Sequence, residues 1–264
     1  MPTHVADVLA SIEKLSGHPL HGDEGVQLGP ADREVRRATV CWMASRAALL
    51  SAERDRADLV VAHESLFYPY DTRLKAGEVQ PWEAWPTNRQ RREIIERSGL
   101  TLARVHGSAD DICIFDVFAE MLGLGTPLVS GPVHKVYEIP PIPLRRLVER
   151  VKAAVGMDHV RVSCSEADIE RPVHRVGLPW GGLGLFVNVS YQQWALTQGC
   201  DVLIAGEADS YGFRFSAECD VPMIETTHEA SEIPGLRKLT AILVERHPDV
   251  TWYFYDNGNP WRWM

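Results

Sequence analysis

The chain has 264 residues, of which 45% are hydrophobic and 24% are charged, and its formal net charge at pH 7 is −9. This length and balance are typical of a globular protein with a substantial core. The negative net charge argues against nonspecific binding to nucleic acid or to an anionic membrane, because both require a basic surface.

Hydrophobic patterning in the first half predicts helices that alternate with buried strands. Residues 5–15 place Val5, Val8, Leu9, Ile12 and Leu15 on one face of an amphipathic helix. The aromatic- and proline-rich stretch 65–85 predicts a loop or a lid rather than core. The predicted elements are, in chain order, a helix over 5–15, a strand over 37–43, a helix over 46–54, a strand over 58–62, a helix over 87–98, a strand over 100–105, and a helix over 110–122 that ends at Gly123.

The second half continues the same alternation. Residues 138–143 are rich in proline and predict a connector between elements. The predicted elements after it are a helix over 144–155, strands over 160–162 and 175–178, a helix over 190–197, strands over 202–205 and 223–226, a helix over 233–246, and a strand over 251–255. Strands that alternate with helices pair mostly in parallel, so the predicted fold class is a layered α/β fold.

Several features predict a cytoplasmic protein. The first 16 residues lack the basic start and continuous apolar run of a signal peptide, and no segment approaches the roughly 20 apolar residues of a membrane helix. The cysteine count is odd and no pair has the CxxC spacing, which predicts small buried side chains in a reducing compartment and argues against a thiolate zinc site. The five cysteines are Cys41, Cys113, Cys164, Cys200 and Cys219.

An internal repeat indicates that one α/β unit has been duplicated. Residues 57–64 and 200–207 share an Asp, an apolar run and an Ala-x-Glu ending, and residues 106–110 and 228–232 both read His-x-x-x-acid. Both pairs of segments occur in the same order, which predicts an N-terminal half over 1–134 and a C-terminal half over 135–264. Because α/β sheets bind ligands at the carboxyl ends of their strands, we expect a shared cleft between the halves.

The side chains expected at these strand ends are imidazoles and carboxylates. A His that ends a strand and an acid four residues later can turn toward the same point. Such a set without thiolates suits Zn, Fe(II) or Mn, and bridging carboxylates can hold two metal ions about 3.5–4 Å apart. The candidate groups are His63 with Glu64, His106 with Asp110, and His228 with Glu232.

Each of these residues also has a purely structural interpretation. His106 could be a hydrogen-bonded residue at a strand end, and Asp110 could be the N-cap of its helix. Glu232 could be a favourable acid in a first helical turn, and Glu64 could be a solvated loop residue. The metal interpretation depends on all of them converging.

Two other features are interpreted as structural. His18 and His21 lie in a loop that contains Gly and Pro. Residues 181–184, Gly-Gly-Leu-Gly, predict a tight turn; the alternative, a cradle for an anion, is weakly supported because the Lys-Ser/Thr of a phosphate-binding loop is absent.

An ordered set of motifs over nearly the whole chain resembles the Nif-three-like dinuclear metal centre family, whose members are also described as GTP cyclohydrolase I type 2 homologues. The motifs are Gly-Val-Gln-Leu-Gly at 25–29, His-Glu-Ser-Leu-Phe at 63–67, His-Gly-Ser-Ala-Asp at 106–110, Gly-Glu at 206–207 and Thr-His-Glu-Ala-Ser-Glu at 227–232.

The resemblance implies duplicated three-layer α/β units without an inserted domain, a metal site between the halves, and a toroidal hexamer. It implies two divalent ions, with Asp110 and Glu232 as bridging ligands and His106 and Glu207 near the metals. The family carries a second His where this chain has Glu64, a harder ligand that favours Mn or Mg. The implied metal ligands are His63, Glu64, Asp110, His228 and Glu232.

Three functions remain open at this point. The first is a metal-dependent hydrolase of a small molecule, such as a nucleotide or another phosphoester. The second is a non-catalytic metal-binding or regulatory ring. The third is a GTP cyclohydrolase, for which the sequence offers no feature that demands a purine pocket.

Overall fold

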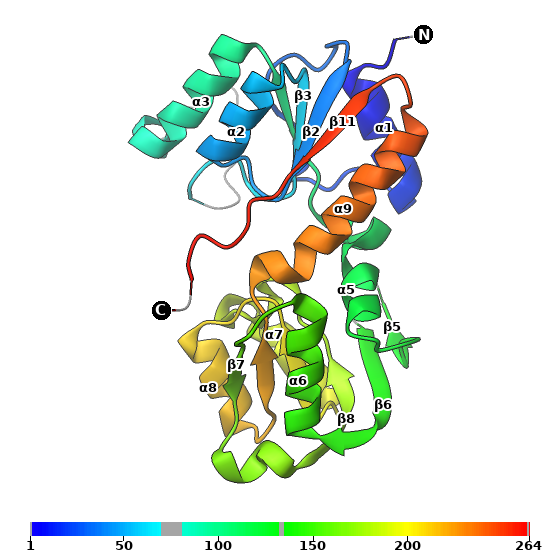
Figure 1. The fold of residues 1–264 in the computed structure, drawn as a ribbon, viewed down its shortest axis with the longest axis vertical. Coiled ribbons are helices and arrows are strands. Elements are labelled where there is room, and N and C mark those ends of the chain that lie inside the picture. The colour runs from blue at the N-terminus through cyan, green and yellow to red at the C-terminus, as the bar shows by residue number, and fades with distance from the viewer. Residues whose placement is uncertain (1, 70–80, 132–134, 263) are drawn as a thin grey trace. The chain divides into compact units, whose positions relative to one another are not determined.

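A computed structural model describes residues 2–69, 81–131, 135–262 and 264. The chain forms two compact units, which we call unit 1 (residues 1–113 and 236–264) and unit 2 (residues 114–235). Each unit has its own β-sheet and its own helices (Figure 1). The mixed α/β fold class is therefore confirmed.

Unit 1 contains a five-stranded sheet in the order β1-β4-β3-β2-β11. Strand β1 pairs antiparallel with β4, and the other neighbours pair in parallel. The strands are β1 (Gly25–Leu28), β2 (Arg37–Cys41), β3 (Leu59–Ala62), β4 (Thr101–Arg104) and β11 (Thr251–Tyr255). The helices of unit 1 are α1 (Val5–Ser16), α2 (Arg46–Arg54), the 3-10 turn η1 (Pro81–Ala84), α3 (Pro86–Ser98) and α4 (Gly107–Ala109).

Helices cover both faces of this sheet, as predicted for parallel strands, whose two faces are both buried (Figure 1). Helices α2 and α3 lie on one face, where Leu49, Ile94 and Ile95 pack with strand residues in one buried cluster. Helix α1 lies on the other face and buries Val5, Val8 and Ile12 of the predicted apolar stripe, whereas Leu9 and Leu15 are only half-buried.

Unit 2 contains a six-stranded sheet in the order β5-β6-β8-β9-β10-β7, in which only β8, β9 and β10 pair in parallel. Its strands are β5 (Val129–Ser130), β6 (Lys135–Pro143), β7 (Arg161–Ser163), β8 (Pro172–Gly177), β9 (Val202–Ala205) and β10 (Met223–Glu225). Its helices are α5 (Phe115–Met121), α6 (Leu144–Val155), α7 (Val189–Thr197) and α8 (Ser210–Glu218), with 3-10 turns η3 (Glu166–Glu170), η4 (Gly181–Gly184) and η5 (Phe186–Asn188).

Two elements contain the boundaries between the units. The π-helix η2 (Asp110–Ile114) carries the first boundary, and α9 (His228–Arg246) carries the second. The predicted halves divided the chain at 134/135, whereas the compact units divide it at 113/114 and 235/236. The cause is β11, which follows α9 and pairs along its whole length with β2 of unit 1.

The repeated segments occupy equivalent places within the two sheets. Strands β3 and β9 each lie between two parallel neighbours. The Asp before each has the same role, because Asp58 accepts the backbone N–H of Arg37 at 3.0 Å and Asp201 accepts that of Arg175 at 3.0 Å. Each carboxylate thus ties a backbone N–H of the neighbouring strand to the start of its own strand.

Three local predictions differ from the structure. The predicted connector 138–143 is part of β6, where the register with β8 is irregular between Glu138 and Ile142, so that Pro140 and Pro141, which lack an N–H, fall at the irregularity. Helix α8 was not predicted, although Asp209 caps it through the N–H groups of residues 211 and 212. The stretch 65–85 was predicted as a loop or lid rather than core, but Leu66 and Phe67 belong to the buried cluster of unit 1; residues 70–80 of this stretch lie outside the described residues.

The cysteine prediction holds for Cys41, Cys113 and Cys200, which are buried, while Cys219 is exposed. Burial raises the pKa of the Cys41 thiol to about 12, so it is inert at neutral pH. Within the part of the chain that the structure describes, every helix is too short or too polar to span a bilayer.

Candidate metal centre

The ends of β3 and β4 bring the first group of predicted ligands together within unit 1. The two strands are parallel neighbours, with Ala62 paired to Arg104, so the residues that follow them leave the same edge of the sheet. The rings of His63 and His106 meet edge to face, with centroids 4.9 Å apart. One ligand atom each of His63, His106 and Asp110 lies within 4.8 Å of the others.

Hydrogen bonds fix the orientation of both imidazoles. His63, which is 1% exposed, has its Nδ1 3.1 Å from the carbonyl oxygen of Val105. A carbonyl only accepts, so Nδ1 carries a proton, and in the neutral ring the lone pair is on Nε2. His106 has its Nδ1 2.9 Å from the Asp23 carboxylate, which orients that ring in the same way. Such partners are typical of metal-binding histidines, so this group fits a divalent ion.

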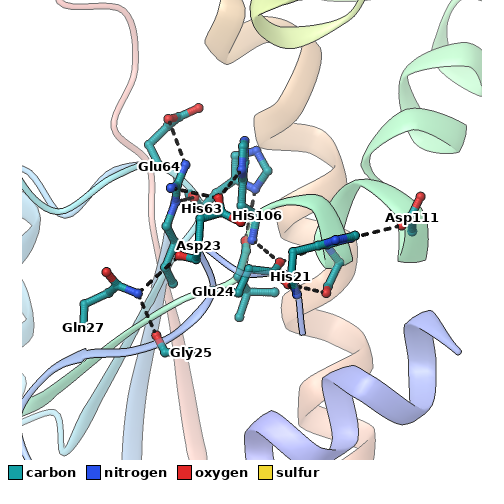
Figure 2. A network of polar contacts seen from close by, with 12 residues as sticks. His21, Asp23, Glu24, Gly25, Gln27, His63, Glu64, His106 and Asp111 are labelled. Carbon is teal, nitrogen blue, oxygen red and sulfur yellow. Dashed lines mark hydrogen bonds and ion pairs between the residues drawn. The ribbon is translucent and has the colours of Figure 1, made fainter. Parts of the chain in front are cut away.

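Two acids from the loop before β1 support the same group (Figure 2). Asp23 contacts His106, and Glu24 accepts the backbone N–H groups of His106 at 2.6 Å and Ser108 at 2.9 Å. Glu24 therefore caps α4, whose N-cap residue is His106 and not Asp110. The interpretation of Asp110 as an N-cap is thus wrong, and the helix that was predicted to begin there begins at Gly107.

Asp110 is the first residue of the π-helix η2. A π-turn widens the helix and frequently occurs at functional sites, where it redirects a side chain. Here it follows α4 directly, so that Asp110 lies beside the two imidazoles.

Glu64 is 2% exposed and is therefore not the solvated loop residue of the structural interpretation. The buried guanidinium of Arg104 lies 3.9 Å from the Glu64 carboxylate and 2.9 Å from that of Asp23, and its Nε donates to the carbonyl of His63 at 3.0 Å. Arg104 thus offsets two negative charges beside the imidazoles. Sequence reasoning missed it, although a lone charge in a buried strand was a usable signal.

Unit 2 groups His228, Glu232 and Glu207. Strands β9 and β10 end side by side, with Glu225 paired to Ala205, and α9 begins at His228. The ring of His228 lies between two carboxylates, with Nδ1 3.0 Å from Glu207 and Nε2 3.2 Å from Glu232. The hydrogen bond from His228 lowers the pKa of Glu207 against the opposing effect of burial. Glu232 is four residues into the helix, on the same face as His228.

The glycine-rich turn η4 packs directly against this second group. A Cβ on Gly181, which has φ +53°, would lie 2.1 Å from the Glu232 carboxylate and 3.2 Å from His228 Nε2. The N–H of Gly181 donates to Ser231 Oγ at 2.9 Å. The turn therefore has a packing role, because this N–H is already used within the protein.

The repeat explains why the two groups differ. Glu64 and Glu207 occupy equivalent positions, as do His106 and His228, but Gly206 stands where unit 1 has His63. A Cβ at Gly206 would lie 2.4 Å from Gly181 N, so the turn leaves no room for a side chain there. All predicted site residues thus fall into two groups, one in each unit.

Known proteins resemble this chain in sequence and in fold. The family model described as Duf34/NIF3 (NGG1p interacting factor 3) matches residues 3–260. No curated protein matches the chain.

Several solved structures share the fold. The protein ybgI, described as of unknown function, is 22% identical with a TM-score of 0.78, covering 98% of this chain and 100% of that one. A Bacillus cereus protein related to NIF3 is 13% identical with a TM-score of 0.79 over the full length of both chains. Reduced HcgD from Methanocaldococcus jannaschii is 16% identical with a TM-score of 0.73, covering 96% and 98% of the two chains.

Proposed function

This chain belongs to the Duf34/NIF3 family, and from that membership together with its two histidine and carboxylate groups we propose that it binds divalent metal ions. The observation that carries the proposal is the convergence of ligand atoms from His63, His106 and Asp110 within 4.8 Å, with the His63 lone pair held on Nε2. The proposed ligands are His63, Glu64 and Asp110 in unit 1, with His106 beside them, and His228 and Glu232 in unit 2, with Glu207 beside them.

The donor chemistry supports Zn, Fe(II) or Mn as the ion. Imidazole nitrogens and carboxylate oxygens without thiolates suit these metals. The carboxylate of Glu64 moves the preference toward harder ions such as Mn or Mg, while the neighbouring Arg104 guanidinium offsets part of its charge.

We propose further that the bound metal serves hydrolysis of a phosphoester or a similar small molecule. A divalent cation would supply Lewis-acid activation of water and of the electrophile. Within unit 1, Asp23 holds the Nδ1–H of His106, which leaves the opposite ring nitrogen able to exchange a proton with a reacting group. Glu24 holds the backbone of the same residue, so the ring is positioned by two acids.

The test is metal analysis of the purified full chain after chelation and reloading with Mn, Fe or Zn. We expect the variants His63→Ala and Glu232→Ala each to lose bound metal, whereas His174→Ala, a half-exposed His paired with Asp201, retains it. Unchanged metal content in both site variants would contradict the proposal. Glu64→His, which restores the family residue, is expected to shift selectivity away from Mn and Mg.

A substrate screen tests the hydrolytic step separately. The reloaded protein is incubated with phosphoesters and nucleotides, and GTP is included with detection of formate. Cleavage that is lost in Glu232→Ala supports a hydrolase, while cleavage that survives this change counts against it. Metal binding with no turnover of any substrate would favour the non-catalytic alternative.

A further inference from the structure

A second cluster of metal-type ligands lies in unit 1, outside the group formed by His63, His106 and Asp110. The Asp111 Oδ2 atom is 3.0 Å from His18 Nε2 and 3.8 Å from His21 Nε2. The two rings are neighbours, with centroids 4.6 Å apart, and one ligand atom of each residue lies within 4.8 Å of the others. Figure 2 shows His21 and Asp111 to one side of His63 and His106.

The contacts of His18 indicate that positive charge is favoured between its ring and Asp111. The Nδ1 of His18 lies 2.7 Å from the carbonyl oxygen of Pro19, which can only accept, so Nδ1 carries a proton. The lone pair of a neutral ring then points from Nε2 at a carboxylate 3.0 Å away, and two acceptors repel at that distance. Either a second proton on the ring or a metal ion between the atoms relieves this repulsion.

A metal ion between the two atoms provides positive charge in place of that second proton. The Pro19 carbonyl then serves as the outer partner that orients a ligating ring.

The loop that carries the two histidines is held in place by the surrounding chain. Helix α1 is capped at its C-terminus by Gly17, with φ +80°, and Glu13 accepts the N–H of Leu20 at 3.1 Å. Glu24 accepts the N–H of His21 at 2.6 Å. A Cβ on Gly107 would lie 2.8 Å from the His21 ring, so the glycine lets that ring lie against the start of α4. The ligands therefore sit on a fixed scaffold.

Neighbouring residues of η2 can serve two different groups. Successive helical residues point about 100° apart at 3.6 residues per turn, and a wider π-turn keeps them divergent. Asp110 thus lies with His63 and His106, while Asp111 contacts His18 and His21.

We propose that His18, His21 and Asp111 form a separate binding site for a divalent transition-metal ion. Two imidazole nitrogens and one carboxylate oxygen suit Zn²⁺ or Cu²⁺ rather than Mg²⁺ or Ca²⁺. Three protein ligands leave a further coordination position for water or a small ligand. The side chains are 31%, 48% and 25% exposed, so an ion can reach them from solvent. The proposal does not depend on the function proposed above.

The test is titration of the metal-free full chain with Zn²⁺, monitored by calorimetry, with metal analysis of the resulting protein. We expect the double variant His18→Asn/His21→Asn to bind one Zn²⁺ fewer per chain than the unmodified protein. His174→Asn is the matched control, because it removes an exposed His paired with a carboxylate but no second imidazole. His63→Ala is expected to keep the ion that the double variant loses.

A second measurement guards against an indirect effect of the double variant. Asp111→Asn keeps the side-chain shape and removes one ligand, and since losing only an outer partner weakens metal binding 10–100-fold, we expect at least a tenfold weaker affinity for this ion. With Cu²⁺, the nitrogen couplings of the paramagnetic resonance spectrum should identify two imidazoles that the double variant lacks. Equal Zn²⁺ binding by all variants, or loss of the same ion in His63→Ala, would overturn the proposal.

Discussion

Arg104 shows how a single buried charge supports the candidate site. Its guanidinium is nearly inaccessible and contacts Asp23 at 2.9 Å, while Glu64 lies 3.9 Å away. Because removing one partner of a buried ion pair leaves the other charge poorly compensated, we expect Arg104→Met to lower the free energy of unfolding by about 3 kcal/mol. Urea denaturation of the metal-free protein measures this change.

A second variant separates charge from packing at this position. Glu64→Gln removes the buried negative charge, so the combination Arg104→Met/Glu64→Gln should be less destabilised than the sum of the two single changes, because contacting residues are not additive. Additive effects would show that Arg104 acts only through its other contacts, with Asp23 and the His63 carbonyl.

The predictability of the site follows from sequence distance. His63, Asp110 and His228 could be proposed because each follows a recognisable apolar strand and recurs in a repeated motif. Asp23 could not be proposed from the sequence, because it contacts His106 across 83 positions of the chain and no local sequence pattern indicates that contact. Contacts with residues of a distant loop can be identified only in the folded structure.

At the scale of the elements, the turn η4 is the support of the second ligand group. A Cβ on Gly181 would displace the Glu232 carboxylate, and its φ of +53° adds the strain of a left-handed residue. We expect Gly181→Ala to cost about 1 kcal/mol of stability and to weaken metal binding at least tenfold. Metal titration and thermal unfolding measure the two effects.

Gly156 provides the matched control for this change. It also has a positive φ, +66°, but a Cβ there would meet nothing within 4 Å. Gly156→Ala should therefore lose similar stability and keep its metal affinity. Equal metal binding by the two variants would show that Gly181 has no role in placing Glu232.

Elements with a strong local signal were predicted closely, and those shaped by pairing were not. Helix α2, helix α6 and strand β9 have the predicted bounds, because each has a clear apolar pattern. Strand β6 contains three prolines and reads locally as a connector, yet pairing with β8 makes it a strand. A strand forms through hydrogen bonds to a neighbouring strand. The periodicity of its own sequence carries no information about that neighbour, so β6 could not be predicted locally.

At the scale of the whole molecule, the duplication is visible in the internal order of the two sheets. Each has three parallel strands with an antiparallel strand beyond the last of them, β1 beside β4 and β7 beside β10. On the other side they differ, since unit 1 adds the parallel strand β11 and unit 2 the antiparallel strand β6. The repeated motif predicted the parallel strands that the two sheets share. The strands that differ, β11 and β6, account for the difference between the predicted halves and the compact units.

The assembly state is the remaining expectation at this scale. The family resemblance implies a ring of six chains. Exposed apolar side chains lie close together in unit 2, where Val187 is 83% exposed and Tyr211 is 68% exposed. The rings of Phe186 and Tyr211 are 5.6 Å apart. Apolar side chains that cluster at a surface often mark an interface between subunits. We therefore expect native mass spectrometry to find a species of six chains, and Val187→Glu to convert it to smaller species. Val244→Glu, which also changes an exposed apolar residue, is the control and should leave six chains together. A monomeric unmodified protein would contradict the expected ring, and an intact ring in Val187→Glu would exclude this surface as its interface.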